Sequence, residues 1–576
     1  MIRIATRWTA LAVLAGALLS TCLAYPGPAQ VPGAKKGRQP AAAKAAPKKK
    51  PNRPQYKRQI RDQIAAIVAG KAEAVIGELE VYLEKAPDDP EALYALAIAY
   101  GQADRTREAL ESMKRALQQR LPPGRFLAGP RNLVKPLAET AEFRELAERQ
   151  GGPLIHGPML GCVTDRSAKF WIRTTEEVSF QVVLSEAPDQ FIRSATVFTD
   201  AEHDYTAVAE VERLKPDTLY FYDVQVRGQS ALGPKVPSFR TLPAAEQPAR
   251  FQVGFGGGAG YTPWHERMWD TIASHKLPAF LLLGDNVYID TPTKPEVQQY
   301  CYYRRQSRPE YRRFIASTSV FAIWDDHDFG DNDCWCGPEV NEPAWKPAVW
   351  RVYRDNWNNP AYGGGEKRPG CWFRFSIADV DFFMLDGRYY RTNPKAENPS
   401  MLGPVQKEWL LDGLKHSDAT FKVLASPVPW VLDAKGTSLD TWRGFQAERE
   451  EIFAFLEENR IDGVVLLSAD RHRSDYWRID RERGYPLYEF ESSRLTNVHT
   501  HGLMPGALFG YNTKCSFGLL TFDTTRPDPE LTYQILNIDD ELIHTFTVKK
   551  SEISHASGGF SRKARQIEKD FGATEK

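Results

Sequence analysis

The sequence has few cysteines, and its first 58 residues contain no acidic side chain. Seven cysteines stand in 576 residues. The pair Cys334 and Cys336 lacks both the CxxC spacing of a thiol redox site and the second pair that a zinc site needs. No Gly-x-Ser-x-Gly string occurs, which argues against a serine hydrolase. Basic and acidic residues both number 74, and 12 of the basic ones precede residue 59. The remainder is therefore acidic, and no nucleic-acid binding is expected.

The N-terminus has the pattern of an export signal. Basic residues precede an apolar run, Ala10–Leu19, which is shorter than the roughly 20 residues that span a bilayer. The sequence predicts a signal peptide over residues 1–24 and a periplasmic or secreted protein. Leu19–Cys22 approaches a lipoprotein box, but Thr21 matches it poorly, so a lipid anchor is the weaker alternative. No later run reaches the roughly 18 apolar residues of a transmembrane helix.

The composition then changes along the chain. Residues 25–58 are rich in Pro, Ala and Lys and predict a disordered linker, with contact to an anionic surface as an alternative. Residues 59–150 show helical periodicity. Apolar positions recur there about every 34 residues, at Leu79, Pro87, Leu93, Leu96, Ala97, Tyr100, Ala109, Met113 and Ala116. This pattern resembles tetratricopeptide repeats. Two repeats bury little surface, so we expect them to dock on the next domain; whether their groove binds a protein partner stays open.

Two further units follow. Residues 153–243 alternate with a period of two and predict a β-sandwich. The string Leu214–Tyr222 resembles the strand-entry corner of a fibronectin type III-like domain, where a tyrosine hydroxyl returns to upstream backbone. Residues 249–550 predict an α/β domain, and residues 555–576 a frayed tail. The strands expected in the α/β domain are Phe251–Phe255, Ala279–Leu283, Val320–Trp324, Phe382–Leu385, Phe421–Ala425 and Gly463–Ser468.

Polar residues directly follow three of these strands, in the strings Leu283–Asp290, Trp324–Asp333 and Leu467–Arg473. Open α/β sheets bind ligands at the carboxyl ends of their strands, so these strings are expected to meet. Each alone could be a turn or a solvated loop. Together they favour a metal site of oxygen ligands and imidazole, because so much charge beside apolar strands is costly without cations.

The strings resemble the motifs of the alkaline phosphatase D (PhoD-like) family of metallophosphatases. Gly284-Asp285-x-x-Tyr288, Trp324–Asp328 and Ser468-x-Asp470-x-His472 carry the resemblance. It covers residues 154–550 and implies a four-layer α/β/β/α catalytic domain after a fibronectin-like one. The activity implied is that of a phosphomonoesterase or phosphodiesterase in which a metal-bound oxygen attacks phosphorus. The cofactors implied are trivalent iron and calcium.

The resemblance also implies roles for individual residues. The metal ligands would be Asp285, Tyr288, Asp326, Asn332 (or a neighbour in that loop), Asp470 and His472. Asp285 would bridge the ions, Tyr288 would bind iron through its phenolate, and His472 would complete the iron shell. His327 would be the catalytic acid or a phosphate contact. Arg388 would hold the substrate, because its guanidinium matches phosphate geometry.

One departure from the family concerns the iron. Family members commonly carry Gly-Ser-Cys after the first catalytic strand, but Gly256–Gly260 contains no cysteine. Iron could then have fewer protein ligands, His265 or Glu266 could substitute, or a harder ion could replace it. The run could also cradle phosphate through the amide of Gly258, or be a plain turn. We expect bound metal, chiefly Ca²⁺, without the charge-transfer colour of an iron–thiolate site.

The predicted function is an exported, metal-dependent phosphoesterase that acts on phosphate mono- or diesters. One alternative is a phosphodiesterase or phospholipase D-like enzyme acting on cell-envelope phosphodiesters. Another is a non-catalytic binding protein with a degenerate metal site, which the missing cysteine and the added helical repeat would suit. The otherwise complete set of motif residues argues against the latter.

Overall fold

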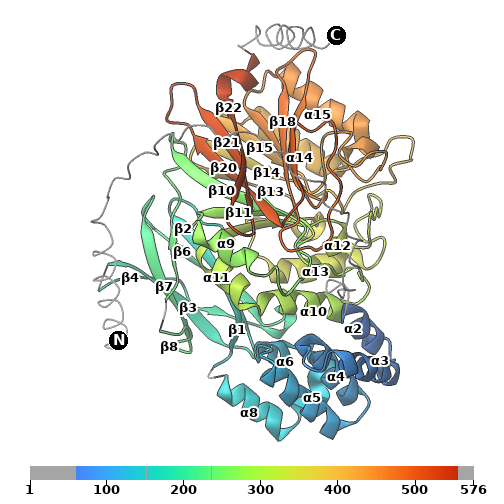
Figure 1. Ribbon diagram of the computed structural model, residues 1–576. Helices are drawn as coiled ribbons and strands as arrows, with labels where there is room; N and C mark the ends of the chain where they lie inside the picture. Colours follow the sequence, from blue (N-terminus) through green and yellow to red (C-terminus); the bar gives the residue numbers. More distant parts are fainter. Residues whose placement is uncertain (1–59, 151, 188, 235, 556–576) are drawn as a thin grey trace, which may run out of the picture.

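The computed structural model describes residues 60–150, 152–187, 189–234 and 236–555. The predicted signal peptide, the linker and the tail beyond residue 555 lie outside them. Three units follow one another along the described chain: a helical unit, a β-sandwich and a larger α/β domain (Figure 1). Among the described residues, no helix is both long and apolar enough to cross a membrane.

The helical unit packs against the α/β domain. Its helices are α2 (Arg61–Val68), α3 (Ala72–Lys85), α4 (Pro90–Gln102), α5 (Thr106–Gln118), α6 (Gly124–Ala128), α7 (Arg131–Ala138) and α8 (Ala141–Arg149). The carboxylate of Asp89 accepts hydrogen bonds from the amides of Glu91 and Ala92 and so caps α4, a common helix start. Leu93, Leu96 and the other small and large apolar positions of α4 and α5 are buried. The assignment as tetratricopeptide repeats remains a prediction.

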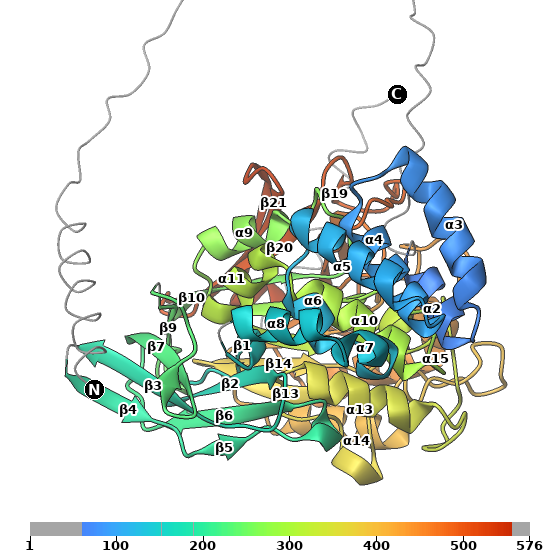
Figure 2. The same cartoon turned by 90° about the horizontal axis from the view of Figure 1, so that it is seen from below.

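Buried polar contacts hold the helical unit in place, which confirms the expected docking. The helices lie beside α10 (Pro295–Gln306) and β1 (Leu154–Gly161) (Figure 2). The carboxylate of Glu91 accepts hydrogen bonds from Tyr300 of α10 at 3.1 Å and from Arg125 of α6 at 3.0 Å. The guanidinium of Arg61, on α2, forms an ion pair with Asp290.

The second unit consists of two antiparallel sheets. Its strands are β1, β2 (Ser167–Thr174), β3 (Ser179–Ala187), β4 (Gln190–Arg193), β5 (Val197–Phe198), β6 (Thr206–Glu212), β7 (Leu219–Val226), β8 (Gln229–Ser230) and β9 (Ser238–Arg240), with the 3-10 turn η1 (Ala201–His203). One sheet has the order β1-β2-β6 and the other β4-β3-β7-β8. The hydroxyl of Tyr220 accepts a hydrogen bond from the amide of Lys215 at 3.0 Å, which is the expected corner contact. The fibronectin type III assignment itself stays a prediction.

The α/β domain contains two mixed sheets. Its strands are β10 (Arg250–Gly256), β11 (Ala279–Leu283), β12 (Ser319–Ile323), β13 (Phe373–Ile377), β14 (Val380–Met384), β15 (Phe421–Ala425), β16 (Val464–Ser468), β17 (Ser474–Ile479), β18 (Leu487–Ser492), β19 (Phe509–Tyr511), β20 (Ser516–Asp523), β21 (Glu530–Asn537) and β22 (Leu542–Lys549). Its remaining helices are α9 (Met268–Ser274), α11 (Pro309–Ser317), α12 (Asp326–Phe329), α13 (Lys346–Asn356), α14 (Gly403–Lys415) and α15 (Gln446–Glu458), with the 3-10 turns η2 (Gly365–Lys367), η3 (Trp442–Phe445) and η4 (Lys550–Ile553).

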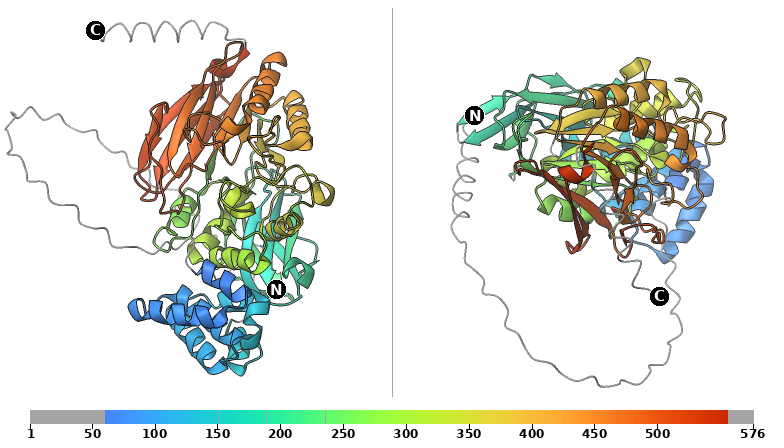
Figure 3. Two further views of the ribbon diagram at one scale, coloured as in Figure 1. Left: turned by 90° about the vertical axis from the view of Figure 1, so that its right-hand side faces the viewer. Right: turned by 90° about the horizontal axis from the view of Figure 1, so that it is seen from above.

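Aromatic side chains join these sheets face to face. The first sheet has the order β12-β11-β10-β20-β21-β22 and the second β13-β14-β15-β16-β18-β17-β19. Phe382 of β14 packs on Phe522 of β20 between the sheets. Its neighbour Phe383 points the opposite way and contacts Trp409 of α14, because successive strand residues face opposite sides. On the outer face of the first sheet, Phe280 packs on Phe314 of α11. These contacts form the expected α/β/β/α layers (Figure 3).

Strand polarity places the functional loops. β10, β11 and β12 are parallel, as are β14, β15, β16 and β18. Each of the six expected strands is present, shifted by at most two residues at either end. The loops that follow β10, β11, β12 and β16 therefore emerge at the carboxyl ends of the strands, and residues 257 and 493 form a bridge between the two sheets.

Candidate metal and substrate site

Left-handed backbone follows two strands at the site. Asp285 comes after β11 with φ 54°, and Asp470 and His472 come after β16 with φ 70° and 48°. Such conformations cost a non-glycine residue about 1 kcal/mol or more, and they gather at functional sites. Gly284 has φ 101°, and a Cβ there would lie 2.6 Å from Cβ of Asp325. Glycine thus allows two loops to approach closely and turns Asp285 toward the centre.

One pocket collects most of the predicted site residues. Those that line it are Asp285, Asp326, His327, Asn332, Asp470 and His472. Further lining residues, which the sequence did not single out, are Asp333, Lys435, Arg471, Val498, His499 and His501. Tyr288 is buried directly behind this pocket. The strings that follow β11, β12 and β16 therefore do meet.

Tyr288 joins two of the candidate ligands. Its hydroxyl donates to Oδ2 of Asp285 at 2.8 Å, lies 2.9 Å from Nε2 of His472, and accepts from the side-chain amide of Asn497 at 2.7 Å. Burial first, and then the charge of Asp285, raises the pKa of Tyr288 well above its usual value. Oδ1 of Asp285 is buried and accepts no hydrogen bond from the described residues. Oδ2 lies beside the phenol and the imidazole, and the buried, unpartnered Oδ1 suits a cation.

Asp326 is held by backbone amides. Its two carboxylate oxygens accept from the amides of His327, at 3.0 Å, and Asp333, at 2.7 Å. Ligand atoms of Asp285, Asp326 and His327 lie within 4.8 Å of one another. Nδ1 of His327 forms an ion pair with Asp290. Burial opposes the charge on His327, but Asp326, Asp285 and Asp290 outweigh it and raise the pKa of His327 to about 10.

A lysine balances the acidic side of the pocket. Nζ of Lys435 lies 3.3 Å from Asp470, 2.9 Å from Asp440 and 3.2 Å from Asp333. These carboxylates raise the pKa of Lys435 above its usual value, although burial opposes them. Lys435 and Asp440 belong to the loop between β15 and α15. No motif marks that loop, so only the three-dimensional arrangement identifies them.

The structure corrects the prediction for Arg388. Its side chain is fully buried and does not line the pocket. The guanidinium donates to Asp325 at 2.5 Å and to both oxygens of Asp440, at 2.8 and 3.2 Å. The carboxylates of Asp325 and Asp440 already accept from the guanidinium N–H groups that would bind a phosphate. In this position Arg388 contacts carboxylates of the loops behind the pocket.

Gly258 does not cradle a phosphate here. Its amide donates to the carbonyl of Gly284 at 3.2 Å, and the next amide, of Ala259, donates to the carbonyl of Asp285 at 2.8 Å. These bonds tie the glycine run to the β11 loop. A Cβ at position 258, where φ is 65°, would lie 3.0 Å from Cδ2 of His472. Glycine is thus required by space and conformation, and the Gly258 amide is already bonded to backbone.

Neither proposed substitute for the missing cysteine faces the pocket. Glu266 is fully buried and pairs with Arg305 at 3.0 Å. Nδ1 of His265 lies 3.0 Å from the carbonyl oxygen of Thr496, and neither side chain lines the pocket. Instead, two other imidazoles, His499 and His501, stand beside His472.

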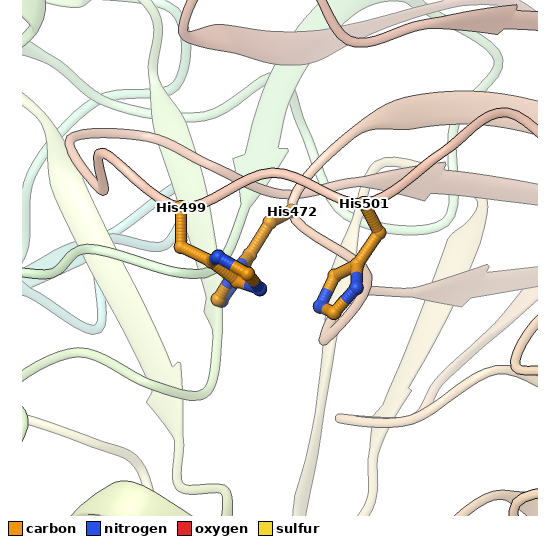
Figure 4. Close-up of side chains that lie close together, drawn as sticks. All are labelled: His472, His499 and His501. Carbon is orange, nitrogen blue, oxygen red and sulfur yellow. The ribbon is translucent and has the colours of Figure 1, made fainter. Parts of the chain in front are cut away.

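These three imidazoles form a cluster at the pocket (Figure 4). The ring centres of His499 and His501 lie 5.3 and 5.4 Å from that of His472 and 4.6 Å from each other. Burial, followed by the charge of Arg471, lowers the pKa of His501 to about 3. The His-x-His spacing could have drawn attention in the sequence, but it follows no apolar strand directly.

Comparison with known proteins agrees with this geometry. A family model described as PhoD-like phosphatase matches residues 254–504, which include every loop of the site. The loops of the site thus lie in the part of the chain that is similar to PhoD-like phosphatases. A second family model, described as a domain of unknown function, matches residues 152–243, the span of the β-sandwich.

Individual relatives extend the likeness. Alkaline phosphatase D of Bacillus subtilis (strain 168) is 24% identical over 346 residues. That match covers 52% of this chain and 58% of the relative, so the chain matches little more than half of the relative's length. A solved structure titled "Structure of PhoD" superposes with a TM-score of 0.57 at 17% identity, covering 68% of this chain and 89% of that one.

The fold also extends to a eukaryotic enzyme. A purple acid phosphatase isolated from yellow lupin (Lupinus luteus) seeds superposes with a TM-score of 0.52 at 12% identity, covering 68% of this chain and 74% of that one. At such low identities the two structures support the fold of this part of the chain, and they say nothing about individual side chains.

Proposed function

We propose that this chain is an exported, metal-dependent phosphoesterase that hydrolyses phosphate mono- or diesters. The observation that carries the proposal is the meeting of Asp285, Asp326 and Asp470 with Tyr288 and His472 at the carboxyl ends of separate strands of the PhoD-like domain. The family match supports the reaction class. Export rests on the pattern of residues 1–24.

The donor set fits hard cations. Four aspartates line the pocket, and Oδ1 of Asp285 is buried with no hydrogen-bond partner among the described residues, so divalent ions such as Ca²⁺ fit these oxygens. Asp285, Tyr288 and His472 would hold one ion. With the Tyr288 phenolate as a ligand, that ion could be Fe³⁺. The side chains of Asp326, Asn332 and Asp470 would hold divalent ions. When bound, such ions withdraw charge from a phosphate ester and activate water for attack.

The protein's own groups would supply the proton and the charge balance. Because Asp290 holds Nδ1 of His327, His327 would present Nε2, and its raised pKa keeps it protonated near neutral pH. It would donate that proton to the departing oxygen. Lys435 would attract a phosphate oxygen at the acidic side of the pocket. Arg388 would act indirectly, by keeping Asp325 and Asp440 in position.

The test compares chromogenic mono- and diesters. For Asp285→Ala we expect at least a thousand-fold loss of turnover on p-nitrophenyl phosphate or bis(p-nitrophenyl) phosphate. The control Asp412→Ala, at an exposed position on α14, should match wild type. The ratio of the two wild-type rates identifies the ester class. Substantial turnover by Asp285→Ala would contradict the assignment, and wild-type protein that holds metal without turnover would favour the binding-protein alternative.

A further inference from the structure

Three histidines face one another where the loop after β18 passes the loop after β16. Each offers a ring nitrogen, and these nitrogens all lie within 4.8 Å of one another. His472 is buried, His501 is half-buried and His499 is exposed. Figure 4 shows the three rings close together, with those of His472 and His499 overlapping in this view and that of His501 beside them. Imidazole nitrogens at such distances are the ligands that borderline ions such as Zn²⁺ prefer.

Hydrogen bonds fix the loop so that both outer histidines lie beside His472. The hydroxyl of Thr500 donates to the carbonyl of His472 at 3.0 Å. The amide of His499 donates to the side chain of Asn497 at 3.0 Å, and the carbonyl of His501 accepts from Asn512 at 2.9 Å. Thr500 thus bonds to the backbone of the β16 loop, while its two neighbours flank the ring of His472. The arrangement comes from the backbone of two loops, so it does not depend on the exposed ring alone.

The space beside His472 is also where a cysteine is missing. A Cβ at Gly258 would lie 3.0 Å from Cδ2 of the His472 ring, so a side chain at this position would point toward that histidine. Glycine supplies no ligand there, and His265 and Glu266 are held elsewhere. His499 and His501 approach His472 with two donor groups of their own.

We propose that His499 and His501 join His472 as ligands of a borderline transition-metal ion such as Zn²⁺. Tetrahedral Zn²⁺ with Zn–N bonds of about 2.0–2.1 Å places its nitrogens about 3.3 Å apart. Small side-chain rotations of the two less buried histidines close the present spacing to that value. Three imidazoles leave a fourth position open toward the pocket. This site shares His472 with the ligand set proposed above for Asp285 and Tyr288, and it would exist without phosphoesterase activity.

The test is spectroscopic and uses Co²⁺ alone as the probe. Full-length protein is freed of metal with a chelator and titrated with Co²⁺, whose visible d–d bands report nitrogen ligands in tetrahedral geometry, and then with Zn²⁺ as competitor. We expect wild type to develop these bands and lose them to Zn²⁺. His499→Ala and His501→Ala should each bind Zn²⁺ at least tenfold more weakly, and the double variant should show no tetrahedral bands.

His416→Ala, at an exposed histidine directly after α14, is the matched control and should bind as wild type does. Circular dichroism of each metal-free variant checks folding, which should persist because neither substituted ring is fully buried. Equal Co²⁺ spectra and Zn²⁺ affinities in wild type and the double variant would overturn the inference. Ester hydrolysis is measured separately: a protein that shows the histidine bands but hydrolyses no ester refutes the proposed function and leaves this site standing.

Discussion

Arg388→Ala separates a structural arginine from one that binds substrate. In wild type the guanidinium contacts the carboxylates of Asp325 and Asp440 in a fully buried position. The substitution leaves Asp325 without its arginine, and Oδ2 of that residue accepts no other hydrogen bond from the described residues. Removing one partner of a buried ion pair typically costs about 3–5 kcal/mol. Asp440 keeps Arg391 and Lys435, so the lower half of that range is the better expectation.

Thermal unfolding of the full-length chain measures this loss. At roughly 2–4 °C per kcal/mol for domains of about 200 residues, the melting temperature of Arg388→Ala should fall by about 6–15 °C. The melting temperature of Arg388→Lys should fall by a similar amount, because an ammonium group cannot form hydrogen bonds to both carboxylates in the same plane. The control Arg526→Ala breaks an arginine–aspartate pair at the surface, and its melting temperature should differ from that of wild type by no more than about 2 °C.

Steady-state kinetics of the same variant below its melting temperature complete the test. We expect KM for a phosphate ester to stay within about threefold of wild type, since Arg388 does not reach the pocket. A KM raised tenfold or more in a variant that melts like wild type would refute the reasoning and restore Arg388 as a substrate ligand.

Three further predictions concern the glycine run, the helical unit and the metal. Gly258→Ala should lower the melting temperature and activity, because its Cβ would lie 2.9 Å from the amide nitrogen of Arg494. The control Gly70→Ala has a similar φ and open space around it, so it should cost only the left-handed strain of about 1 kcal/mol. Equal losses of stability in the two variants would contradict this prediction. For Arg61→Ala we expect urea unfolding at neutral pH to give a free energy of unfolding lower by about 1–2 kcal/mol. The reason is the pKa of Asp290: burial raises it, but His327 and Arg61 outweigh burial and lower it to about 2. This contribution is complete above pH 4 and disappears as the pH falls from about 4 to about 2, so the difference between variant and wild type should vanish there, and a difference that persists at pH 2 would count against the ion pair. Chelator treatment should lower the melting temperature by several degrees, because an ion present at 100 times its Kd stabilises the fold by about 2.7 kcal/mol; an unchanged melting temperature would indicate that the pocket binds no ion.

The sequence could predict the elements whose residues interact locally or repeat. The six apolar strands were recognisable because residues such as those of Phe421–Ala425 are buried on both faces. β13, β17, β18 and the later strands were not predicted. The central residues of β13 are partly exposed, and β17 carries charged residues such as Asp475, which pairs with Arg473 two residues earlier.

The limits of prediction at the site have a similar cause. The motif residues Asp285, Asp326 and His472 could be placed together because each follows a strand end. Lys435 and Asp440 could not, since they come from a loop without a motif; Lys435 lines the pocket and Asp440 lies behind it, paired with Lys435. The role of Arg388 was misjudged for a related reason: sequence indicates the chemistry of a guanidinium, but not which anions surround it.

The contact between Arg61 and Asp290 has a practical consequence for anyone who divides this protein. A fragment cut to the limits of the PhoD-like family match would contain the whole set of candidate ligands, yet it would expose to water the aspartate that orients His327, together with the Tyr300 face that Glu91 and Arg125 now cover. The helical unit therefore covers Asp290 and Tyr300 behind the pocket, and the smallest fragment that preserves these contacts includes Arg61.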